Sequence, residues 1–91
     1  MNRLLEFQTR EDLMLVENQL SKKNVACKLA ASPALIKRGC GLSLKFNAED
    51  VAEVMSIMAD LTIRPSFEIY ENIRDAAGRS IIRKLASSIK Q

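Results

Sequence analysis

The strongest constraint on the fold of this chain is the order in which two hydrophobic periodicities alternate along it. A half-buried strand has an apolar residue at every second position, whereas an amphipathic helix has one at every third or fourth. Four stretches alternate and predict strands: residues 3–8, 25–31, 42–46 and 67–71. Helical spacing follows the first and the third of them. The predicted order is therefore strand, helix, strand, strand, helix, strand.

The first helix has clear start and stop signals. Thr9 is a suitable N-cap, and the acidic residues that follow it suit the positive end of a helix. Leu13, Val16 and Leu20 form one apolar stripe. Asn24 predicts the C-terminal stop, because asparagine tolerates the left-handed conformation that ends many helices.

The second helix is predicted to begin after Asn47, which we expect to cap it, and to end before Arg64-Pro65. Apolar residues at helical spacing form one stripe along this helix, and we expect the stripe to face the core. It consists of Val51, Val54, Met55, Met58 and Leu61.

This order predicts an α+β fold, a ferredoxin-like βαββαβ sandwich with both helices on one face of the sheet. The opposite face is expected to be polar and open, or partly covered. It would display Glu6, Ala26, Lys28, Ser43, Lys45, Glu68 and Tyr70.

We expect residues 1–73 to form this domain and residues 74–91 to extend it as a basic amphipathic helix. Ile81, Ile82, Leu85 and Ile89 have helical spacing. A helix of this length is too weak to be stable alone in water. It should therefore pack on its own sheet or form a homo-oligomer with a second chain.

Length and composition restrict the class of protein. Ninety-one residues suffice for one small domain, and 47% hydrophobic residues predict a folded globule. The apolar runs are too short to cross a membrane, and the N-terminus does not resemble a secretory signal. We therefore expect a cytoplasmic protein whose two cysteines are reduced.

The net charge of +3 is unevenly distributed. Residues 74–91 carry +4, whereas the preceding 73 residues carry −1. A nucleic-acid-binding domain would have a basic face on its body. RNA binding through the tail is therefore the lowest-ranked function, and its affinity would depend steeply on salt.

Cys40 is the candidate functional residue. It lies between Gly39 and Gly41, in a stretch expected to form a loop. Glycines leave the sulfur uncovered and allow positive φ values. Lys37 and Arg38 directly precede this motif, and nearby cations favour a thiolate. The alternative is a glycine turn in which the cysteine is incidental.

Other chemistry has little support in the sequence. Cys27 alternates with apolar residues on a predicted strand, so we expect a buried and inert sulfur. The chain has no histidine, which excludes a Cys-His nucleophile pair, and no spacing typical of a zinc site. The acidic pairs lie in first helical turns, where they stabilise the helix dipole. We expect no enzyme activity, no metal and no cofactor.

The run from Pro33 through Gly39-Cys40-Gly41 to Leu42, followed by an alternating apolar strand, resembles the central motif of a small family of selenium/sulfur carrier-like proteins. The resemblance covers roughly residues 3–73, on the same order of elements, and leaves out the tail. Family members often have a serine where this chain has Arg38. The resemblance implies that Cys40 bears the chalcogen and that the two glycines shape its loop.

Two functions follow as hypotheses. In the first, Cys40 accepts sulfur or selenium from a donor of the cysteine desulfurase type and passes it to an acceptor protein, with Lys37 and Arg38 stabilising the thiolate. In the second, the domain is a non-catalytic interaction or oligomerisation module in which Cys40 has no role.

Overall fold

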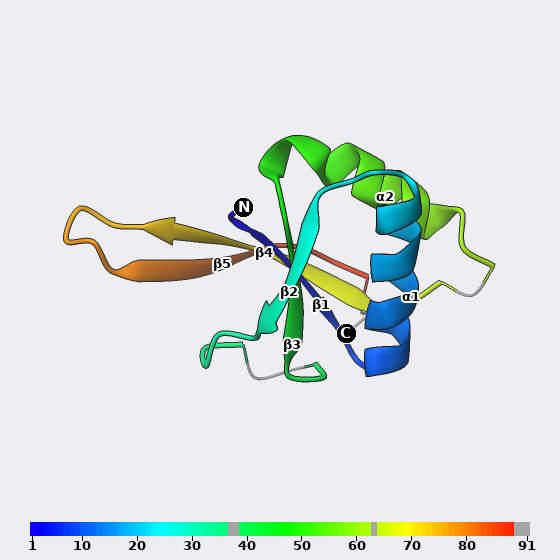
Figure 1. Cartoon of the computed structure of the whole chain (residues 1–91). Coiled ribbons are helices and arrows are strands. Elements are labelled where there is room, and N and C mark those ends of the chain that lie inside the picture. The colour runs from blue at the N-terminus through cyan, green and yellow to red at the C-terminus, as the bar shows by residue number, and fades with distance from the viewer. Residues whose placement is uncertain (37–38, 63, 89–91) are drawn as a thin grey trace.

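The structure of the chain is a computed structural model, and it describes residues 1–36, 39–62 and 64–88. The described residues form an antiparallel sheet of five strands in the order β2-β3-β1-β4-β5 (Figure 1). The strands are β1 (Arg3–Phe7), β2 (Cys27–Ala31), β3 (Leu42–Phe46), β4 (Phe67–Arg74) and β5 (Ser80–Ser87). The helices are α1 (Arg10–Lys22) and α2 (Val51–Ala59). The predicted α+β class is confirmed, with one strand more than expected.

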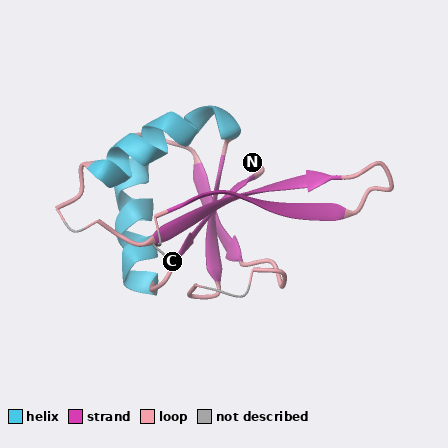
Figure 2. Cartoon of the chain, turned by 180° about the vertical axis from the view of Figure 1, so that it is seen from behind, coloured by secondary structure: helices cyan, strands magenta, loops and turns pink. Residues whose placement is uncertain are grey.

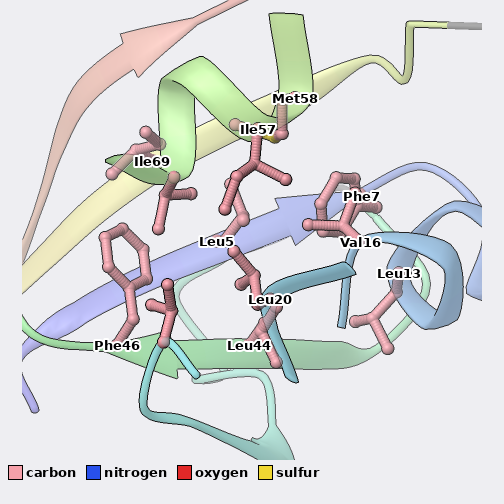
Figure 3. Packing of buried hydrophobic residues seen from close by; sticks show 12 residues of the cluster. Leu5, Phe7, Leu13, Val16, Leu20, Leu44, Phe46, Ile57, Met58 and Ile69 are labelled. Carbon is pink, nitrogen blue, oxygen red and sulfur yellow. The ribbon is translucent and has the colours of Figure 1, made fainter. Parts of the chain in front are cut away.

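Both helices pack on the same face of the sheet and form the hydrophobic core with it. Leu5, Phe46 and Ile69 from three strands meet Leu20 of α1 and Met58 of α2 (Figure 3). Burying a side chain of this size contributes roughly 1.5–3 kcal/mol. Leu5 and Phe7 of β1 belong to this core, whereas Glu6 between them lies on the opposite face of the sheet.

Helix α1 confirms its predicted signals. The Thr9 side chain accepts a hydrogen bond from the backbone N–H of Asp12 at 3.2 Å. The whole predicted stripe of Leu13, Val16 and Leu20 is buried. After the helix, Asn24 has a φ of 59°, the left-handed conformation expected of a helix stop.

Helix α2 differs from its prediction in two respects. Asn47 precedes a short 3₁₀ turn, Ala48–Asp50, and makes no side-chain capping bond, so α2 begins only at Val51. The buried residues are Val54, Ile57 and Met58, whereas Met55 is 38% exposed. The predicted stripe was therefore wrong at Met55. Among the described residues, no helix is long and apolar enough to cross a membrane.

The predicted C-terminal helix is wrong, because residues 80–87 form β5 and pair with β4. A tight turn reverses the chain between the two strands. The Asp75 side chain accepts from the N–H groups of Ala77 and Arg79, both at 2.9 Å. Gly78 follows with a φ of 81°, which glycine adopts readily. This turn brings the tail back alongside β4 as a hairpin.

Cross-strand partners on β4 explain why the tail is stable as a strand. Arg83 forms an ion pair with Glu71, and Lys84 lies 2.6 Å from Glu68. The pairing register shifts between Ile69 and Tyr70, where β5 has one more residue, Leu85, than β4. Helical spacing of the isoleucines was therefore misleading. The hairpin extends beyond the part of the sheet that the helices cover (Figures 1 and 2).

The second face of the sheet is less open than the sequence predicted. Glu6, Ser43 and Glu68 are buried there, although Lys28 is exposed as expected. Part of the connection between β2 and β3 lies against this face, because Ser32 hydrogen-bonds to Glu6. The cover over Glu6 and Ser43 thus comes in part from the loop that carries Cys40.

Candidate functional site

The connection between β2 and β3 holds Cys40, and we call its residues 32–36 and 39–41 the Cys40 segment. Backbone hydrogen bonds hold this segment in place. The backbone N–H of Ser32 donates to the carbonyl of Gly41 at 3.0 Å, which closes the segment on itself. The N–H of Cys40 donates to the carbonyl of Phe7, also at 3.0 Å. Cys40 is thereby fixed to the end of the central strand β1.

Gly39 approaches β1 too closely for a side chain. A Cβ atom at this position would lie 2.8 Å from the Phe7 carbonyl oxygen and 3.6 Å from Oε1 of Glu6. Gly39 also has a φ of 104°. Gly41 has a φ of 87°, but a Cβ there would meet nothing within 4 Å. Gly39 is therefore required by both space and conformation, and Gly41 by conformation alone.

Cys40 is half-buried, whereas the sequence predicted an uncovered sulfur. It packs against the edge of the hydrophobic core. Its Sγ lies 3.7 Å from the carbonyl oxygen of Leu42, a distance that suits a weak S–H donor. The sulfur is consequently held in place on one side.

Lys37 and Arg38, which we expected to favour the thiolate, lie outside the described residues. Their effect on Cys40 remains a prediction from the sequence.

Glu6 is a residue of this site that the sequence analysis did not select. Only 2% of Glu6 is exposed. Its Oε1 accepts from the hydroxyl of Ser32 at 2.7 Å, and its Oε2 accepts from the hydroxyl of Ser43. Burial raises the pKa of the Glu6 carboxyl. The two serine hydrogen bonds lower this pKa in part, and the charge of Glu68 raises it further. The structure thus places an uncommon group, a buried carboxylate, below the Cys40 segment.

A second buried carboxylate lies beside the first. Glu68 on β4 is directly opposite Glu6 on β1, and Ser43 on β3 is opposite Glu6 on the other side. Glu68 forms an ion pair with Lys84 of β5 and accepts from the Tyr70 hydroxyl at 3.1 Å. Only the strand register brings these residues together. Alternation alone placed them on a common face without indicating that they touch.

Cys27 is half-buried and lies at the edge of the core, so its predicted complete burial was wrong. Burial raises the pKa of its thiol, and the nearby Glu17 carboxylate raises it further. A raised pKa keeps the sulfur in its unreactive thiol form at neutral pH. Within residues 1–36, 39–62 and 64–88, no group of three or more histidine, cysteine or acidic side chains could hold a metal ion.

Comparison with known proteins identifies the family of this chain. A family model described as "Putative Se/S carrier protein-like" matches residues 2–71. The chain belongs to this family. The match to the Se/S carrier family includes β1 to β3, both helices, the Cys40 segment and most of β4, whereas β5 lies beyond it. No curated protein and no solved structure matches the chain significantly.

Proposed function

We propose that this protein is a sulfur or selenium carrier in which Cys40 bears the chalcogen. The observation that carries the proposal is the position of Cys40, whose backbone is hydrogen-bonded to the end of β1 between two glycines at positive φ. Membership of the Se/S carrier family supports the same function. A sulfur that is held but not fully covered suits reversible loading by a partner.

The transfer is a thiol–persulfide exchange. The Cys40 thiolate attacks the terminal sulfur of a persulfide on a donor of the cysteine desulfurase type. The S–S bond to the donor cysteine breaks, its sulfur leaves as a thiolate, and a new S–S bond forms at Cys40. The proton lost by Cys40 balances the one that the donor thiolate takes up, and no external oxidant is needed. An acceptor thiolate removes the terminal atom by the same exchange, and selenium in that position would follow the same steps.

The residues around Cys40 have distinct roles in this proposal. Gly39 and Gly41 shape the loop. Lys37 and Arg38 stabilise the thiolate and attract an acidic partner. The protein carries one atom per cycle and is not itself an enzyme. Both cysteines are free thiols, which suits the reducing conditions of the cytoplasm.

The test is to load the protein with a cysteine desulfurase and cysteine and to measure its intact mass. We expect the wild type and Cys27→Ser to gain one sulfur atom and Cys40→Ser to gain none. An adduct that survives in Cys40→Ser, or no adduct on the wild type, would reject the carrier function. Labelling of Cys40 at a pH well below the ~8.5 of a free cysteine would support thiolate activation, with Cys27 as the internal reference.

We also propose that β1 to β4 with the two helices constitute a ferredoxin-like unit to which β5 has been added. The strand order β2-β3-β1-β4 supports this, because each helix then joins two strands that have one other strand between them. An experimental structure with a different strand order would contradict it.

The β4–β5 hairpin favours a second function, an interaction or oligomerisation module. Strand β5 is at the edge of the sheet, and Ile81 and Leu85 on it are 41% and 43% exposed. An exposed edge strand can pair with a second chain. The alternative predicts that the double variant Ile81→Lys and Leu85→Lys lowers the molar mass measured by light scattering. A monomeric wild type would reject self-association.

A further inference from the structure

Two serines that flank Cys40 in the sequence donate to the same buried carboxylate. Ser32 directly follows β2, and Ser43 lies in β3. Their hydroxyls donate to the two different oxygens of Glu6, and the two hydroxyl oxygens are 3.2 Å apart. Glu6 of β1 therefore holds the start of the Cys40 segment through Ser32. It also holds β3, the strand that follows the segment, through Ser43.

The residue after Glu6 holds the middle of the same segment. The carbonyl of Phe7 accepts the hydrogen bond from the Cys40 N–H at 3.0 Å, and Gly39 lies directly against this carbonyl and against Glu6. Consecutive residues of β1 thus contact the segment at Ser32, Gly39 and Cys40. Together these contacts fix the position of the Cys40 backbone relative to β1.

Burying a carboxylate costs free energy, so the buried position of Glu6 needs a physical explanation. Burial of an ionised side chain is unfavourable unless hydrogen bonds or ion pairs compensate it. Here the compensation comes from Ser32 and Ser43, while the nearby Glu68 carboxylate opposes it. An apolar residue in place of Glu6 would leave both serine hydroxyls without this acceptor. The carboxylate accounts for how the segment is attached to the sheet.

We propose that Glu6 is a positioning residue for Cys40, which acts through Ser32 and Ser43 to hold the Cys40 segment against the end of β1. This role rests on the proposed carrier function. A fixed backbone presents the Cys40 sulfur to the donor persulfide in one orientation, and such pre-positioning lowers the entropic cost of exchange.

Hydrogen exchange at the Cys40 amide tests this proposal without any donor protein. The Ser32→Ala variant changes a residue outside the sheet and removes the hydroxyl that donates to Glu6 and lies 3.2 Å from the Ser43 hydroxyl. We expect its Cys40 amide to exchange about fivefold faster, the factor that corresponds to one hydrogen bond of ordinary strength. The Glu6→Leu variant leaves neither serine with this acceptor, so its Cys40 amide should also exchange faster than in the wild type. Glu6→Gln keeps one acceptor oxygen and should show a smaller increase.

A matched control is Ser88→Ala, which also removes a serine hydroxyl contact, 2.7 Å from the Phe67 backbone nitrogen. Leu44 in the core reports global stability, so the Cys40 rate of each variant is compared after correction for any change in its Leu44 rate. If Ser32→Ala and Ser88→Ala alter Cys40 exchange equally, or if Glu6→Leu leaves it at the wild-type rate, the positioning role is rejected.

Two reactions of Cys40, alkylation and sulfur loading, distinguish a positioning role of Glu6 from a role in stability alone. In Ser32→Ala, alkylation of Cys40 by iodoacetamide should rise about fivefold with loosening, whereas sulfur loading from a cysteine desulfurase should fall. Equal changes in both reactions would contradict positioning. Failure of the carrier function itself would appear differently, as a wild type with the expected exchange pattern that takes up no sulfur.

Discussion

At the scale of single residues, the two glycines beside Cys40 differ although they look equivalent in the sequence. Both adopt positive φ, at 104° for Gly39 and 87° for Gly41. Only Gly39 also lies against backbone, since an added Cβ would be 2.8 Å from the Phe7 carbonyl oxygen. Real Cβ atoms do not come this close to backbone, so the loop would have to move.

This difference predicts unequal effects of substitution. Gly41→Ala should lower the free energy of unfolding by about 1–2 kcal/mol, the cost of the left-handed conformation for a residue with a Cβ. Gly39→Ala should cost more, roughly 2–4 kcal/mol, because steric strain adds to the same conformational cost. Urea unfolding followed by circular dichroism measures both. Equal losses would mean that the close approach of Gly39 to Phe7 has no energetic consequence.

At the scale of elements, α2 was predicted in the right place but with a stripe that included the wrong residue. Val54, Ile57, Met58 and Leu61 follow the helical spacing, and Met55 lies about 100° around the helix from Val54. Several apolar residues follow one another here, so sequence alone leaves the centre of the stripe ambiguous. Contact with the sheet selects Ile57, which is 8% exposed.

The corrected stripe predicts different responses of two neighbouring side chains. Ile57→Ala should lower the free energy of unfolding by about 2–5 kcal/mol, because it removes a buried side chain from the core. Met55→Ala should change it by only about 0.5 kcal/mol, as is usual for exposed positions. Thermal or urea unfolding of the two variants provides the comparison. A larger loss for Met55→Ala would place that side chain in the core and contradict the structure.

Strand β5 shows why the tail was misread at this scale. Ile81, Ile82 and Leu85 fit a helical period, but Ile81 and Ile82 pair in regular register with Ile73 and Asn72 of β4, and Leu85 lies at the shift in register. The decisive residues are elsewhere, in the turn at Asp75 and Gly78 and in the carboxylates of β4. Tertiary pairing therefore overrides the local pattern.

At the scale of the whole molecule, the two faces of the sheet are stabilised differently. The helix side is an apolar core that includes Leu5, Phe46 and Ile69. The other side contains the buried carboxylates of Glu6 and Glu68 in a network of serines and a lysine. Polar groups in such a layer make stability depend on pH, because the folded and unfolded states bind protons differently.

This network predicts the sign of one contribution to pH dependence. Burial raises the pKa of Glu6, so the folded state binds this proton more tightly than the unfolded state does. The contribution of Glu6 to the free energy of unfolding should therefore fall as the pH rises from the ordinary glutamate pKa to the raised one. Above the raised pKa, the stabilising contribution of the bound Glu6 proton is fully lost.

The Glu6→Gln variant cannot titrate at this position and serves as the reference. The wild type minus Glu6→Gln difference in free energy of unfolding, measured by urea unfolding across this window, should become less favourable to the wild type with rising pH. Subtraction also removes the opposite trend from Asp75, whose pKa is lowered chiefly by the hydrogen bond from the Arg79 backbone. A flat or rising difference would contradict a raised pKa at Glu6.

The sequence by itself determined the local elements and the candidate sulfur. Alternation located β1 to β4, Thr9 and Asn24 marked the limits of α1, and glycines singled out Cys40, because these signals depend only on neighbours along the chain. Tertiary structure alone decided that the tail is a strand, that Ile57 faces the core and that Cys40 is half-buried. It also brought Glu6 to Ser32 and Ser43, residues 26 and 37 positions away. Such contacts depend on strand order and register, which join distant segments and leave no periodic signal in the sequence.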